Sequence, residues 1–114
     1  MHLVDVIVRL EMKPNEDAGA ERRRVLTIAE LATKRLAVED RLGPWEKHYI
    51  LAAIGALALG QLRVARGSLR VVASNDDDFS NHLMLPDRAA ELEQIGVEDI
   101  VAPIAVLRAA WSKP

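Results

Sequence analysis

The most constraining feature of the chain is an uncharged run of twelve residues, Tyr49 to Gly60, half of which are Ala or Gly. A helix that is apolar on every side must be covered on most of them. Within the run, Ala52, Ala56 and Gly60 lie four residues apart and form one ridge, which lets another backbone approach closely. The run therefore predicts tight helix packing and assembly, and it does not indicate a chemical activity.

The length of 114 residues indicates a single helical domain, 1–114, with a small core. Only four residues are aromatic, so the core must consist mainly of Leu, Ile, Val and Ala. The absence of cysteine excludes disulfides, thiolate zinc sites and cysteine nucleophiles. The N-terminus lacks the pattern of a signal peptide, and the longest apolar run is too short to span a bilayer. We therefore expect a cytoplasmic protein without a membrane partner, and the excess of Arg over Lys suggests a bacterial or phage source.

The N-terminal arm, residues 1–13, has apolar residues at alternate positions. They are Val4, Val6, Val8, Leu10 and Met12. This alternation favours a β-strand. A single strand leaves its edge groups unpaired, so it must pair with another copy or another protein. The alternative is a helix, because Leu3, Ile7 and Leu10 also fit a helical stripe.

Residues 15–73 predict an antiparallel hairpin of two long helices. The first helix is expected to begin at Asn15, which can cap free amides, and to continue to Leu42. Gly43 and Pro44 then suit the end of one helix and the start of the next. The second helix is expected from Trp45 to Ala73, with a break at Gly60-Gln61 as the alternative.

The rest of the chain predicts a loop, 74–86, and a shorter pair of helices within 87–114. Asp87 suits the cap of a short helix that ends at Gly96. A last helix is expected over 99–112, with Pro103 tolerated because it lies in the first turn. The predicted fold is therefore all-α.

One family resemblance rests on Tyr49, Ala53, Gly60, Ala65 and Leu69, which follow a pattern of large residue, small residue, turn glycine, alanine and large residue. In this respect residues 46–73 resemble one tetratricopeptide repeat, a two-helix unit that binds peptides. The pattern occurs once, and nothing recurs 34 residues before or after it. We therefore carry no peptide-binding function over to this chain.

Charge is unevenly distributed along the chain. Residues 20–70 hold ten Arg or Lys against five Asp or Glu, whereas residues 76–114 hold three against eight. Arg63, Arg66 and Arg70 share one helix face, and Arg22 to Arg24 form a second cluster. A stripe of arginines is the pattern expected for phosphate contacts, so nucleic-acid binding is one hypothesis. The alternative is that these arginines pair with the acidic part of the chain or with a protein partner.

Residues that suggest catalysis or metal binding are few. Asp76, Asp78 and Ser80 follow the alternation of oxygen ligands in a calcium loop, but Asn81 takes the place of its turn glycine and Asp87 that of its distal glutamate. A metal-dependent enzyme would use Asp76, Asp78 and His82, and no nucleophile lies beside the pair of His82 and Asp78. The three histidines are scattered, and no glycine-flanked serine or phosphate-binding loop occurs. We therefore expect no catalytic residue, metal site or cofactor. A small metal-dependent enzyme is the third hypothesis, after the interaction module and the nucleic-acid-binding regulator.

An apolar patch, Leu83, Met84 and Leu85, follows in the predicted loop. It would either close one end of the helical bundle or contact a partner, because Leu and Met adapt well to binding surfaces. Taken together, the residues favour a non-catalytic helical protein-protein interaction module, a regulator or an assembly subunit that acts as an oligomer, with a homodimer as the expected form.

Overall fold

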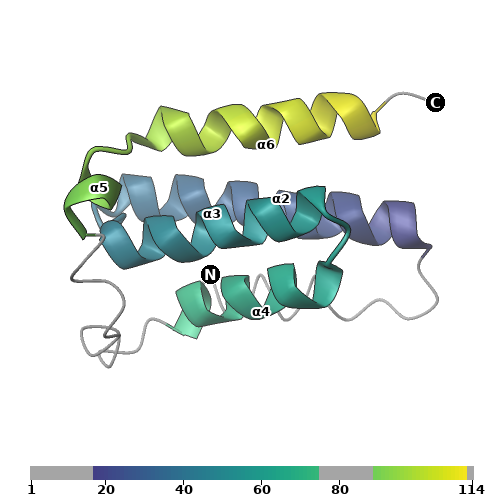
Figure 1. Cartoon of the computed structure of the whole chain (residues 1–114), viewed down its shortest axis with the longest axis horizontal. Coiled ribbons are helices and arrows are strands. Elements are labelled where there is room, and N and C mark those ends of the chain that lie inside the picture. Colours follow the sequence, from purple (N-terminus) through teal and green to yellow (C-terminus); the bar gives the residue numbers. More distant parts are fainter. Residues whose placement is uncertain (1–16, 75–88, 113–114) are drawn as a thin grey trace.

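The computed structural model describes residues 17–74 and 89–112, and these residues form five α-helices and no strand (Figure 1). The helices are α2 (Ala18–Val38), α3 (Pro44–Ala58), α4 (Leu62–Ser74), α5 (Ala89–Glu93) and α6 (Val97–Trp111). The all-helical prediction is confirmed for these residues. The predicted strand in residues 1–13 and nearly all of the predicted loop lie outside the described residues.

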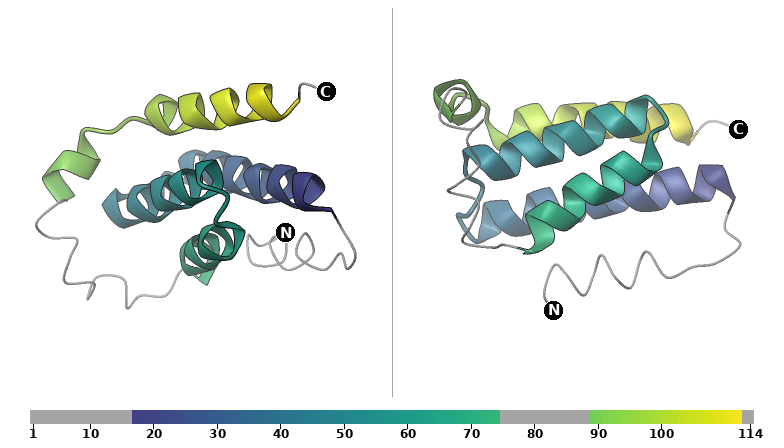
Figure 2. Two further views of the ribbon diagram at one scale, coloured as in Figure 1. Left: turned by 45° about the vertical axis from the view of Figure 1, so that its right-hand side comes forward. Right: turned by 60° about the horizontal axis from the view of Figure 1, so that its bottom comes forward.

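The two central helices, α2 and α3, lie side by side and antiparallel (Figures 1 and 2). Helix α4 covers one side of this pair, and α6 covers the other. The short helix α5 lies at the start of α3, where Lys47 Nζ donates to the backbone oxygen of Leu92 at 3.2 Å. The core therefore lies between three layers of helices, with α2 and α3 in the middle layer.

Alanines of the three first helices are part of this core. Ala29, Ala53 and Ala65 are fully buried and come from α2, α3 and α4. Their small side chains allow neighbouring helix backbones to approach closely. The larger core residues Leu26, Ile50 and Leu69 are also fully buried, so the core consists of aliphatic residues, as the scarcity of aromatic residues indicates.

Helix α2 is shorter at both ends than the predicted range of 15–42. Asp17, not Asn15, is its cap, because the carboxylate accepts a hydrogen bond from the backbone N–H of Ala20 at 2.7 Å. At the other end, Asp40 adopts a left-handed backbone with φ of 53°. Asp tolerates this conformation better than most residues. Gly43, which the sequence favours at the end of the first helix, is extended instead and precedes Pro44 as the cap of α3.

The second long helix breaks at Gly60, so the prediction of an unbroken helix to Ala73 is wrong and the alternative break at Gly60-Gln61 is confirmed. Gly60 has a φ of +77°, which glycine adopts without steric cost. The N–H of Gly60 donates to the oxygen of Leu57 at 3.0 Å, and the N–H of Gln61 donates to that of Ala56 at 2.8 Å. This pair of bonds satisfies the last carbonyls of α3 and ends the helix.

Helix α6 begins two residues earlier than predicted. The N–H of Gly96 donates to Asp99 Oδ2 at 2.8 Å, and this bond sets the start of the helix at Val97. Pro103 therefore lies inside the helix and not in its first turn, contrary to the prediction. Because proline has no N–H, the carbonyl of Asp99 receives no helical hydrogen bond from position 103.

Glu46 is a buried carboxyl at the start of α3. Desolvation by burial raises the pKa of this carboxyl, and hydrogen bonds with the backbone of Glu46 and Gly43 oppose the shift. Because the pKa of Glu46 is higher in the folded state than in the unfolded state, protonation of Glu46 favours folding. This contribution to the free energy of unfolding is fully present below the unfolded-state pKa. That contribution is lost as the pH rises through the folded-state pKa.

Candidate functional site

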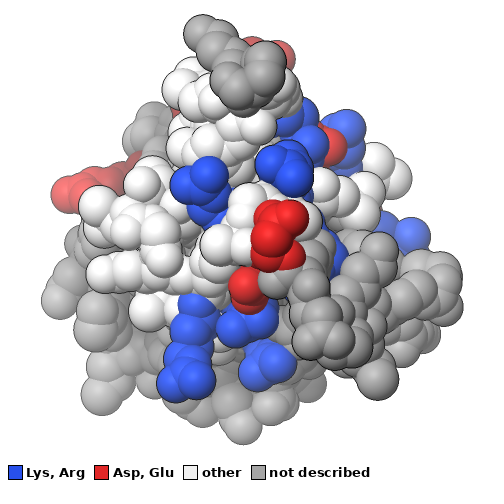
Figure 3. All heavy atoms as spheres, turned by 90° about the vertical axis from the view of Figure 1, so that its right-hand side faces the viewer, with Lys and Arg blue, Asp and Glu red and all other residues white. Residues whose placement is uncertain are grey.

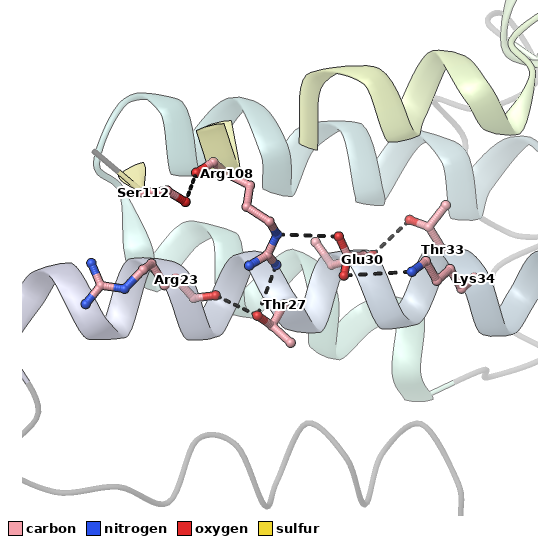
Figure 4. Close-up of polar contacts among 8 residues, drawn as sticks. Arg23, Thr27, Glu30, Thr33, Lys34, Arg108 and Ser112 are labelled. Atoms are coloured by element: carbon pink, nitrogen blue, oxygen red, sulfur yellow. Dashed lines mark hydrogen bonds and ion pairs between the residues drawn. The ribbon is translucent and has the colours of Figure 1, made fainter. Parts of the chain in front are cut away.

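Arg108 is the only charged residue of α6 after its first turn, and it is directed toward α2 (Figure 4). Its Nη2 donates to Thr27 Oγ1 at 3.1 Å, and its Nε lies 3.5 Å from Glu30 Oε2. Thr27 Oγ1 in turn donates to the backbone oxygen of Arg23 at 2.9 Å. These contacts attach α6 to α2 and remove the single positive charge of α6 from its outer side.

A second contact between the same two helices lies near the end of α6. The guanidinium of Arg22 lies over the Trp111 ring, 4.8 Å from its centroid. A cation over an aromatic face is attracted by the ring quadrupole. Because Arg22 meets Trp111 while Glu30 meets Arg108, residue numbers rise along α2 as they fall along α6. The two helices are therefore antiparallel, as Figure 1 also shows.

The opposite side of α6 is exposed and apolar. Ile100 and Ile104 are buried against α2 and α3, whereas Val101 is 37% exposed and Val106 is 67% exposed. We call the exposed side the α6 outer face. It comprises Val101, Ala102, Ala105, Val106, Ala109 and Ala110. After the first turn, no charged or polar residue interrupts this face until Ser112, since Arg108 is directed toward α2.

The predicted packing ridge of Ala52, Ala56 and Gly60 is divided in the structure. Ala56 is buried, with 5% of its surface exposed, whereas Ala52 and Gly60 are exposed. Gly60 lies in the turn between α3 and α4 and so does not extend the ridge of α3. Within the chain, only the middle residue of the ridge is covered.

Two of the three predicted arginines on α4 are exposed, Arg63 and Arg70. Arg66 forms an ion pair with Glu21 of α2, with Nη1 2.8 Å from Oε1. This contact places the start of α4 beside the start of α2, which carries the second arginine cluster.

Two arginine clusters that are far apart in the sequence therefore lie at one end of the molecule. We call this region the arginine end, and it comprises Arg22, Arg23, Arg24, Arg63 and Arg66. Figure 3 views this end, where Lys and Arg side chains surround a small acidic group. Asp17 and Glu21 are the acidic residues at the start of α2, so the arginines outnumber the carboxylates.

The remaining predicted residues lie outside the described part of the chain: Leu83, Met84, Leu85, Asp76, Asp78 and His82. In residues 17–74 and 89–112, no group of three His, Asp or Glu side chains is placed to hold a metal ion. Across the same ranges, no helix combines the length and the apolar character that crossing a membrane requires.

Sequence reasoning missed the α6 outer face. The signal was present, because residues 100–111 contain a single charged residue. What the sequence did not show is that Arg108 is directed inward, so that the outer side carries no charge. No family model, curated protein or solved structure matches this chain.

Proposed function

We propose that the protein is a non-catalytic helical protein-protein interaction module that works as an oligomer, and that the α6 outer face is its binding surface. Such a module would serve as a regulator or as a subunit of a larger assembly. The observation that supports the proposal is the exposure of a continuous apolar side of α6, whose own cationic residue, Arg108, is directed toward α2.

The exposed side of α2 differs from the α6 outer face, and this difference supports the α6 outer face as a binding surface. The exposed side of α2 carries Leu31 and Val38, but the charged residues Arg23, Lys34 and Arg35 interrupt it, as expected for a helix side that contacts water. The α6 outer face carries two exposed valines and four alanines instead. Contiguous apolar patches of this kind mark interaction sites more often than isolated surface residues do. Covering the face removes about 25 cal/mol of unfavourable hydration free energy for each Å² of apolar surface.

Val106→Glu tests the proposal, with Val38→Glu as the matched control. Both valines are exposed on helices, at 67% and 86%, so neither change disturbs the core. A charge at position 106 would be buried in the interface, which costs several kcal/mol without a paired group. We expect Val106→Glu to reduce the solution mass to that of one chain at concentrations where the wild type and Val38→Glu remain associated.

Circular dichroism of both variants controls for loss of helix. Equal masses for Val106→Glu, Val38→Glu and the wild type would refute the α6 outer face as the binding surface.

A second candidate function, nucleic-acid binding, is favoured by the convergence of the two arginine clusters. Arg66 and Glu21 bring α4 and α2 together at the arginine end, so the exposed residues Arg23 of α2 and Arg63 of α4 lie at the same end of the molecule. Guanidinium groups suit phosphate because they donate in a planar fork. The sequence indicates Arg63, Arg66 and Arg70, and the structure adds Arg23 beside the first two, whereas Arg70 lies further along α4, outside the arginine end.

The test of this candidate is the salt dependence of binding to a short DNA duplex, measured by fluorescence anisotropy. Replacing the exposed residues Arg23 and Arg63 with Ala should weaken binding and reduce the slope of log K against log salt by about 2. Lys34→Ala with Arg35→Ala removes the same charge elsewhere on α2 and should leave the slope unchanged. Binding that is insensitive to salt, or an equal loss of DNA affinity in the two double variants, would exclude the arginine end as a nucleic-acid site.

A further inference from the structure

We propose that the occupant of the α6 outer face is a second copy of this chain, with the two α6 helices antiparallel and crossing at Ala105. This inference rests on the proposed function and specifies its partner and geometry. It follows from two observations on described residues, the distribution of charge at the two ends of α6 and the sizes of the side chains on its outer face.

Charge at the two ends of α6 is of opposite sign. The first turn carries Glu98 and Asp99, and the preceding helix α5 adds Glu91 and Glu93. The last turn lies beside the arginine end, because Arg22 lies over Trp111. An antiparallel pair would therefore place the acidic start of each α6 near the arginine end of the other copy. A parallel pair would bring the two acidic starts together, and like charges at an interface disfavour association.

The side chains of the outer face also suit this arrangement. Val101, Ala105 and Ala109 follow one another at intervals of four residues and so lie along one line of the helix. With the crossing at Ala105, each Val101 lies opposite Ala109 of the other copy, and Ala105 lies opposite its own equivalent. A large residue then meets a small one on each side of the crossing, which allows the two helices to pack without a gap or an overlap.

The arrangement is a two-fold contact, in which the same surface of each copy contacts the other. Self-complementary contacts of this kind are by far the commonest in soluble oligomers. Acidic residues lie at the start of the apolar α6 outer face, and the arginine end lies beside its last turn. Turning the face end to end therefore places the acidic residues of one copy near the arginines of the other. The charge of the described residues therefore points to a second copy as the partner.

Cysteine cross-linking tests the geometry directly, because the natural chain contains no cysteine. A disulfide forms when the two Cβ atoms lie about 3.5–4.5 Å apart. Under mild oxidation, Ala105→Cys alone should give a covalent dimer on a non-reducing gel. Val101→Cys alone and Ala109→Cys alone should not, whereas a mixture of these two variants should. Val38→Cys, on an exposed valine of α2, is the control for random collision.

The outcomes separate this inference from the proposed function. If Val101→Cys and Ala109→Cys each cross-link alone as well as Ala105→Cys does, the helices are parallel and the inference is overturned. If no cysteine variant gives more covalent dimer than Val38→Cys, while Val106→Glu is monomeric and the wild type is not, the face binds a copy in another register. In that case the inference fails and the proposed function stands. If Val106→Glu has no effect on the mass, the proposed function itself fails.

Discussion

Replacing Leu26 with Ala is expected to lower the free energy of unfolding by about 2–5 kcal/mol. Leu26 lies in the middle of α2 and none of its surface is exposed. The change removes buried methyl groups and leaves a cavity, which the helices packed around α2 fill only in part. Urea denaturation followed by circular dichroism measures the loss.

Leu31→Ala is the matched control, because the same change is made on the same helix at a residue that is 39% exposed. We expect a much smaller loss for Leu31→Ala, within about 1 kcal/mol. Equal losses for the two variants would contradict the placement of α2 at the centre of the core.

Replacing Ala56 with Leu is expected to cost about 1–3 kcal/mol of stability. Ala56 is buried, with 5% of its surface exposed, on the side of α3 that faces the core. A longer side chain at this position must displace its neighbours or adopt a strained rotamer. Thermal or urea unfolding of the variant measures this cost.

Ala52→Leu provides the control one turn earlier on the same helix, where the alanine is exposed. Its effect on the free energy of unfolding should be small, about 0.5 kcal/mol or less. A stability cost for Ala52→Leu as large as that for Ala56→Leu would mean that the outer side of α3 is also packed, against the exposure seen at Ala52.

The helical class and the main turns of the described residues were predictable because they depend on local signals. Pro44 marks the start of α3, and the uncharged run indicates a closely packed helix. The break at Gly60 was only an alternative, because a glycine inside an apolar run costs about 1 kcal/mol in a helix and does not by itself end one. The break is set by the left-handed backbone of Gly60 and by the two hydrogen bonds that Gly60 and Gln61 donate to the last turn of α3.

The helix ends were predicted less well, because several residues compete for the same cap. Asn15 and Asp17 both suit the start of α2, and the sequence does not show which one accepts the N–H of Ala20. At the other end, Asp40 takes the left-handed conformation that a glycine would adopt more easily, and Gly43 is extended. The competing caps shifted both ends of α2 by several residues.

The candidate site depends on contacts between distant segments, which a single sequence does not reveal. The pairing of Arg66 with Glu21 and that of Arg108 with Glu30 join residues far apart in the chain. The first brings two arginine clusters to one end of the molecule. The second directs Arg108, the cationic residue of α6, away from the outer side of that helix. The sequence shows that Arg108 is present but not which way its side chain is directed.

The most direct test of the central claim is the solution mass of the wild-type chain by light scattering, at two concentrations and two salt levels. We predict the mass of two chains at the higher concentration, with partial dissociation on dilution and at high salt, because the acidic start of each α6 would lie near the arginine end of the other copy. The mass of a single chain under all four conditions would contradict the claim that the α6 outer face joins two copies of this protein.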